Sequence, residues 1–110
     1  MTLATAPIGV FDSGIGGLSV LQALRLELPH EHFVYLADSA NAPYGERGDD
    51  FVRLRTHAIA QYLKAQHGIK ALVIACNTAT AAAVESLRVA LPDLAMIGVE
   101  PAIKPAAASS

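Results

Sequence analysis

Short apolar runs alternate along this chain with segments whose apolar residues recur at helical spacing. The runs cover residues 7–11, 33–37, 71–75 and 94–98. The run at 71–75 is the most continuous and has valine and isoleucine at its centre, which is typical of a strand buried on both faces of a parallel sheet. These four runs are therefore the predicted strands.

The segments between the runs are predicted to be helices. Residues 18–28 carry Leu18, Leu21, Leu24 and Leu28 on one face. A second helix is expected to begin at Asp49 or Asp50 and to end at Gly68. A third, alanine-rich helix covers residues 78–90 with Asn77 or Thr78 as its N-cap, and Pro101 is placed to begin another.

Strict alternation of strands and helices predicts an α/β fold of βαβαβαβ order, with a parallel sheet and flanking helices. The length of 110 residues allows one small domain. We expect residues 1–6 to be a flexible tail and residues 7–110 to form the domain.

Composition and charge exclude several classes of function. The formal net charge of −2 gives no reason to expect binding to nucleic acid or to an acidic membrane surface. No apolar run approaches the roughly 20 residues that cross a bilayer, and residues 1–6 lack the features of a signal peptide. The single cysteine, Cys76, can form neither an internal disulfide nor a cysteine-based metal site, which suits a reducing cytoplasm.

Chemically active side chains follow each predicted strand. Because the carboxyl ends of parallel strands share one edge of the sheet, we expect these groups to converge there. They are Asp12 and Ser13, Asp38 with the Pro43-Tyr44-Gly45 loop, Cys76 with Asn77 and Thr78, and Glu100.

Cys76 has the most reactive position among them. It stands between a buried strand and the start of a helix, where the helix end favours negative charge and hence the thiolate. The unpaired backbone N–H groups of the same helix end can hold a carboxylate. The structural alternative is that Cys76 is a small buried hydrophobic residue.

Two loops have both a functional and a structural interpretation. The glycine-rich turn at 12–17 is neither GxGxxG nor a P-loop, so Asp12 or Ser13 either caps the following helix or lies beside a small ligand. Residues 43–45 form either an ordinary surface turn or part of a binding loop.

Other polar residues are expected to be structural. The four histidines follow no strand and are interpreted as surface or helix-end residues. Arg47, Arg53 and Arg55 are interpreted as a solvated patch.

Four motifs together resemble the N-terminal part of the bacterial glutamate racemase family, within the aspartate/glutamate racemases. They occur in the family's order and cover almost the whole chain. The motifs are GVFDSGIGG at 9–17, DSANAPYG at 38–45, ACNTA at 75–79 and GVEPAIKP at 98–105.

The resemblance implies cofactor-independent interconversion of L- and D-glutamate in the cytoplasm, supplying D-glutamate for peptidoglycan synthesis. One cysteine removes the α-proton and a second returns a proton to the opposite face. By resemblance Cys76 is one catalytic cysteine, and Asp12 assists it. The implied substrate-binding residues are Asp12, Ser13, Pro43, Tyr44, Gly45, Asn77 and Thr78.

The family's second cysteine belongs to a second α/β domain that this sequence does not contain. We therefore expect a truncated racemase domain with half of an active site and an incomplete two-base mechanism, which self-associates into a homo-oligomer. Two alternatives to glutamate racemisation are a related aspartate racemase and a non-catalytic module that binds an acidic metabolite. A cysteine hydrolase is disfavoured because no histidine follows a strand.

Overall fold

The computed structural model describes residues 5–14, 17–41 and 44–98, and every structural statement below concerns these residues. Four strands form a parallel sheet in the order β2-β1-β3-β4. They are β1 (Ile8–Asp12), β2 (Phe33–Ala37), β3 (Ala71–Ile74) and β4 (Ala95–Gly98). The connecting helices are α1 (Gly17–Glu27), α2 (Asp49–His67) and α3 (Asn77–Ala90), with short 3₁₀ turns at η1 (Ser39–Asn41) and η2 (Tyr44–Glu46). The predicted α/β alternation and parallel sheet are confirmed.

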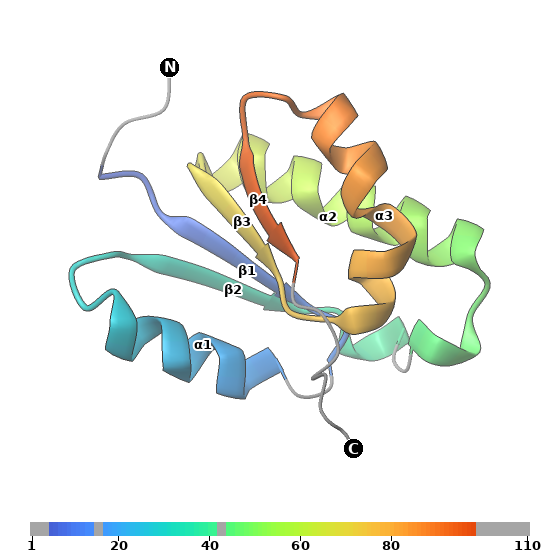
Figure 1. Ribbon diagram of the computed structural model, residues 1–110, viewed down its shortest axis with the longest axis horizontal. Helices are drawn as coiled ribbons and strands as arrows, with labels where there is room; N and C mark the ends of the chain where they lie inside the picture. The colour runs from blue at the N-terminus through green and yellow to red at the C-terminus, as the bar shows by residue number, and fades with distance from the viewer. Residues whose placement is uncertain (1–4, 15–16, 42–43, 99–110) are drawn as a thin grey trace.

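Helices cover both faces of the sheet, as Figure 1 shows: α1 lies on one side, and α2 and α3 lie on the other. The side chains alternate accordingly, because successive residues of a strand point to opposite faces. Val10 and Val73 pack in a cluster with Leu21 of α1. Phe11 and Leu72 pack in a larger cluster with side chains of α2 and α3.

The strand order reverses between β1 and β3. From β1 the chain crosses through α1 to β2 on one side, and it later returns through α2 to β3 on the other side of β1. At such a switch point the two crossover connections diverge to opposite faces, which leaves a crevice at the carboxyl ends of the strands. The ends of β1 and β3 are therefore the position at which this fold favours a ligand site.

The ends of α2 differ in how well the sequence predicted them. Gly68 terminates the helix as expected, with a left-handed φ of 59° and its N–H donating to the Lys64 carbonyl. The expected cap at Asp49 or Asp50 is wrong, because Gly48 is the N-cap and no side chain caps the helix. The two aspartates lie in the first turn, where they still complement the helix dipole.

Several expected features lie outside the described residues. They include most of the tail at residues 1–6 and the helix predicted to begin at Pro101. Within the described ranges, no helix has both the length and the apolar character needed to cross a membrane.

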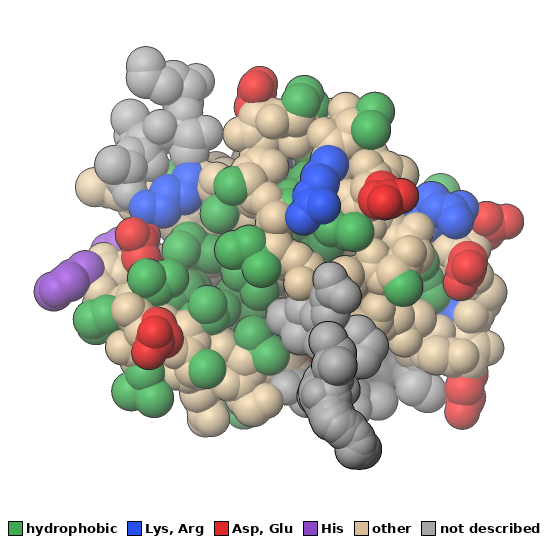
Figure 2. Space-filling view, viewed as in Figure 1, with side chains coloured by type: hydrophobic (Ala, Val, Ile, Leu, Met, Phe, Trp, Pro, Cys, Tyr) green, Lys and Arg blue, Asp and Glu red, His purple; other side chains and the backbone are tan. Residues whose placement is uncertain are grey.

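The sheet face beside α1 remains partly uncovered. Figure 2 shows hydrophobic side chains gathered over the sheet next to this helix. Ile97, on the edge strand β4, is 60% exposed, and Leu18, on the predicted apolar face of α1, is 54% exposed. Contiguous apolar surface of this kind, together with an edge strand, favours association between molecules.

We expect this chain to self-associate as its concentration rises, and Ile97→Lys to weaken the association because a charge on an edge strand opposes pairing. Sedimentation velocity across a concentration series measures this. Leu54→Lys is the matched control, since Leu54 is similarly exposed but lies on α2. A wild-type chain that stays monomeric throughout the series would contradict the expectation.

Candidate active site

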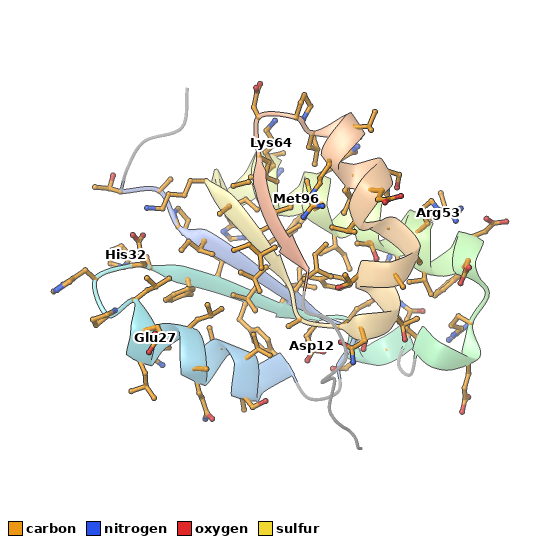
Figure 3. The ribbon with its side chains drawn as sticks, in the orientation of Figure 1. Asp12, Glu27, His32, Arg53, Lys64 and Met96 are labelled. Atoms are coloured by element: carbon orange, nitrogen blue, oxygen red, sulfur yellow. The ribbon has the colours of Figure 1, made fainter. Side chains whose placement is uncertain are left out.

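Backbone hydrogen bonds join the carboxyl ends of β1, β2 and β3 just beyond the last residues that pair in the sheet. The Ala75 N–H donates to the Phe11 carbonyl at 2.7 Å, and the Asp38 N–H donates to the Asp12 carbonyl at 2.9 Å. Because Phe11 pairs with Ile74 in the sheet, Asp12 and Ser13 lie beside Ala75 and Cys76. Figure 3 shows Asp12 at this edge, near the first turns of α1 and α3. The segments after β1 and β3 are therefore adjacent, as predicted.

Asp12 is held at the start of α1. Its Oδ2 accepts hydrogen bonds from the Gly17 N–H and from the Tyr35 hydroxyl, both at 2.9 Å, and the residue is only 1% exposed. Burial, together with the hydrogen bond to Asp12 and its negative charge, raises the pKa of Tyr35. Asp12 therefore caps α1, as the structural interpretation of the glycine-rich turn predicted.

The second oxygen of Asp12 is different. Its Oδ1 is buried and has no hydrogen-bond partner among the described residues. Buried carboxylate oxygens are normally paired, so an unpaired one has the capacity to accept a further hydrogen bond from a ligand. Capping of α1 and ligand binding are thus compatible roles for this residue.

Cys76 is the N-cap of α3. Its backbone is extended, with φ −145° and ψ 119°, and its Sγ accepts the Ala79 N–H at 3.5 Å. The expectation that Asn77 or Thr78 caps this helix is therefore wrong. The sulfur faces the positive end of the helix dipole.

The residues flanking Cys76 leave polar groups near the start of α3. Asn77 is exposed and Thr78 is half-buried, while Ser13 on the neighbouring segment is 5% exposed. The Thr80 hydroxyl donates to the Cys76 carbonyl at 2.9 Å and so fixes the first turn of the helix. This arrangement combines a thiol, hydroxyls, an amide and a helix N-terminus.

The loop after β2 brings η2 against α3. A Cβ atom placed on Gly45 would lie 4.0 Å from Thr78 Oγ1, so the backbone of Gly45 faces the first turn of the helix. Pro43 lies outside the described residues. The structure thus brings Gly45 and Thr78 together, as the sequence predicted.

The side chain of Tyr44 is buried in the core. The residue is 1% exposed, its ring centroid lies 6.0 Å from that of Phe11 and 6.4 Å from that of Phe51, and its hydroxyl donates to Asp38 Oδ2 at 2.5 Å. If this segment contacts a substrate, it does so through the backbone at Tyr44 and Gly45 and not through the phenol.

Asp38 has a structural role that the sequence did not reveal. We expected its carboxylate to face the site, but it accepts hydrogen bonds from Arg55, Tyr44 and Asn41. Burial raises the pKa of Asp38, yet the hydrogen bonds from these three side chains and the Arg55 charge outweigh burial, so its pKa lies below the usual value. The carboxylate is ionised and fully engaged.

The expected solvated arginine patch is wrong for Arg55, which makes the ion pair with Asp38. Arg53 pairs with Asp50 and also donates to the Ala82 carbonyl on α3, and Arg47 stacks over the Phe51 ring. No spacing rule signals the Arg55 contact, because its partner lies 17 residues away in an irregular loop.

The histidines lie away from the strand ends, as expected, but the surface or helix-end interpretation is wrong for His57, which is half-buried in the middle of α2. His57 contacts the Ser86 hydroxyl at 2.7 Å between α2 and α3, and His30, His32 and His67 are exposed. Glu100 lies outside the described residues. Within the described part of the chain, no group of three His, Cys, Asp or Glu residues is arranged to hold a metal ion.

Comparison with known proteins identifies closely similar sequences and structures. No family model matches the chain. Glutamate racemase from Cupriavidus pinatubonensis is 64% identical over 105 residues, which is 96% of this chain and 38% of the relative. The predicted resemblance to glutamate racemase is confirmed.

The solved structures agree with the sequence comparison. Thermus thermophilus glutamate racemase in complex with β-chloro-D-alanine superposes with a TM-score of 0.80 at 50% identity, over 86% of this chain and 36% of that one. The Escherichia coli enzyme in complex with L-glutamate and the activator UDP-MurNAc-Ala gives a TM-score of 0.83 at 40% identity, over 91% and 38%. The chain spans about 40% of the length of the curated relatives that it matches.

We expect Gly17→Ala to disturb the Asp12 site, because an added Cβ would lie 2.3 Å from the Asp12 carboxyl carbon. Relief requires α1 or Asp12 to move, which should lower the free energy of unfolding by about 1–3 kcal/mol. Urea titration measures the loss. Gly48→Ala is the matched control because open space surrounds that position, and equal losses in both variants would contradict the expectation.

The ion pair at Asp38 predicts a pH-dependent difference in stability. Since the folded-state pKa of Asp38 is lowered, its contribution is fully present above the unfolded pKa of about 4 and is lost as pH falls through the folded value. At pH 7 the free energy of unfolding should be larger for the wild-type chain than for Asp38→Asn. The difference between the two free energies should be smaller at pH 3. Urea titrations at both pH values measure it, and a constant difference would contradict the assignment.

Proposed function

We propose that this chain is the N-terminal part of a glutamate racemase, which interconverts L- and D-glutamate by cofactor-independent proton transfer. The similarity to glutamate racemases over nearly the whole chain supports this function. The observation that carries the proposal is the position of Cys76, whose thiol caps α3 at the switch point of the sheet, beside the segment that carries Asp12. This is where an α/β fold binds small ligands.

In this proposal Cys76 is the base or acid on one face of the substrate. As a thiolate it takes the α-proton, and the electron pair of the broken C–H bond remains on the substrate as a carbanion. A second thiol then gives a proton to the opposite face, which inverts the carbon. That second group would come from the part of the relatives' length that this chain does not span.

Asp12 is assigned a supporting role at the same site. Its Oδ2 is fixed by Gly17 and Tyr35, so its orientation is set before a ligand arrives. Its Oδ1, which has no partner among the described residues, can accept a hydrogen bond from the substrate ammonium group. Ser13 lies on the same segment and supplies a hydroxyl.

The other substrate contacts are assigned to the two segments that meet at the start of α3. Asn77 and Thr78 supply an amide and a hydroxyl, and Tyr44 and Gly45 supply backbone N–H groups. These donors suit a carboxylate, as do the free N–H groups of a helix N-terminus. Pro43 is assigned to the same binding segment by resemblance.

The chemistry demands such a preorganised site because the α-proton of an amino acid is very weakly acidic. Without a cofactor to delocalise the charge, fixed dipoles and exclusion of water must stabilise the carbanion. A thiol and a thiolate with matched affinities for the proton suit transfer in both directions near neutral pH.

We assign residues 7–110 to a single racemase-type domain and residues 1–6 to a tail. The wider role proposed for the complete protein is cytoplasmic supply of D-glutamate for peptidoglycan synthesis. Homo-oligomerisation is part of the proposal and follows from the apolar sheet face described above.

Exchange of the α-proton in D₂O tests this function. A full-length protein carrying this chain should incorporate deuterium at the α-carbon of L- and of D-glutamate with inversion, followed by NMR and polarimetry. Cys76→Ser should reduce inversion at least about a thousandfold, since a hydroxyl is a far weaker base than a thiolate. Exchange from one enantiomer should fall more than from the other, because only one face loses its base.

Two controls make the assay decisive. Ser86→Ala, in the second half of α3 where it contacts His57 of α2, should retain wild-type inversion. Aspartate in place of glutamate tests the related racemase. Undiminished inversion by Cys76→Ser, or turnover of aspartate in preference to glutamate, would contradict the proposal.

A further inference from the structure

A hydrogen-bond network outside the strand ends connects α2 to the proposed binding loop. At its centre the Asp38 carboxylate accepts two bonds from Arg55, one from Nε and one from Nη2, both at 2.9 Å. The same carboxylate accepts the Tyr44 hydroxyl and is approached by the Asn41 amide at 3.1 and 3.2 Å. The network therefore spans η1, η2 and α2.

Arg55 makes a bidentate ion pair with Asp38, which fixes the orientation of the two groups as well as their distance. Both guanidinium nitrogens engage opposite oxygens of one carboxylate, which sets the plane of the Asp38 side chain. A lysine cannot reproduce this fork, because its ammonium is a single point charge.

Asp38 depends on this partner because its side chain is only 8% exposed. The other donors, Tyr44 and Asn41, are neutral. A buried carboxylate left with neutral partners loses the charge that offsets its desolvation. Removing the guanidinium should therefore loosen the carboxylate and the Tyr44 hydroxyl bound to it.

Tyr44 transmits the position of Asp38 to the site. Its ring is clamped between Phe11 of β1 and Phe51 of α2, and its hydroxyl is fixed by Asp38. With both ends of the side chain held, the backbone of Tyr44 and Gly45 has one position relative to Thr78. The contacts of the Tyr44 side chain with Phe11, Phe51 and Asp38 therefore fix the backbone of η2 that faces α3.

We propose that Arg55 is a positioning residue for substrate binding, which fixes the Tyr44-Gly45 backbone against α3 through the Asp38 carboxylate. The proposal rests on the proposed function, since it concerns the same substrate site. Arg55 touches neither the substrate nor the reacting atoms. Arg55 holds the backbone N–H groups of Tyr44 and Gly45 in place before the substrate arrives. Substrate binding therefore does not have to order this loop.

This role predicts a distinct kinetic signature in the full-length protein. Arg55→Met should raise the KM for both enantiomers about tenfold, with kcat changed less than about threefold, because ground-state and transition-state binding weaken together. The two enantiomers have equal free energy, so kcat/KM must fall by the same factor in both directions. This equality checks the measurement internally.

Variants on the same network separate the contributions. Arg55→Lys should give an intermediate KM, because it keeps the charge and loses the fork. Tyr44→Phe should also raise KM, because it removes the hydroxyl that connects the loop to Asp38. This variant keeps the Asp38–Arg55 ion pair, so it tests the network even if Arg55→Met folds poorly. Arg53→Met is the matched control, on the same helix and similarly exposed, and should keep the wild-type KM.

Hydrogen exchange of the 39–46 segment supplies a second readout that does not depend on turnover. Faster exchange in Arg55→Met than in Arg53→Met, together with the raised KM, supports positioning. An unchanged KM in Arg55→Met, or a fall in kcat alone from loss of folded enzyme, would overturn it. Failure of the wild-type protein to racemise glutamate would instead contradict the proposed function.

Discussion

The reversal of strand order between β1 and β3 constrains where every functional group of this chain can lie. Because α1 follows β1 on one face of the sheet and α3 follows β3 on the other, the carboxyl ends of β1 and β3 are not both covered by one connection. The first turns of α1 and α3 both lie at this edge of the sheet, where the Gly17 N–H donates to Asp12 and the Ala79 N–H donates to the Cys76 sulfur. Asp12 and Cys76, which accept these N–H groups, are therefore buried, oriented and close to the positive end of a helix dipole.

Two aspartates near these ends are stabilised differently, and the difference assigns their roles. Asp12 is bound by an N–H and a phenol, both neutral, and its second oxygen has no partner among the described residues. Asp38 is bound by a guanidinium and has both oxygens engaged. The first has capacity left for a ligand. The second has none, so its ionised side chain serves to hold the loop that carries Tyr44.

Most of the fold could be predicted from the sequence, because the signals for it are local. The strand and helix periodicities span a few residues each, and Gly68 ends α2 through its own backbone conformation. Residue choice at helix starts was less predictable: Cys76, not Asn77 or Thr78, caps α3, and Gly48, not an aspartate, caps α2. Several residue types can cap a helix, and the local backbone decides among neighbours. The ion pair of Arg55 had no local signal at all.

The sequence by itself determined the α/β class, the position of Cys76 between a strand and a helix, and the resemblance to glutamate racemase. These depend on short periodic patterns and on residue identity. Only the tertiary structure decided that the Tyr44 phenol faces the core, that Asp38 pairs with Arg55, and that one oxygen of Asp12 has no partner within the described ranges. The physical reason is that such contacts join residues from separate elements, whose distances are fixed by packing and not by spacing along the chain.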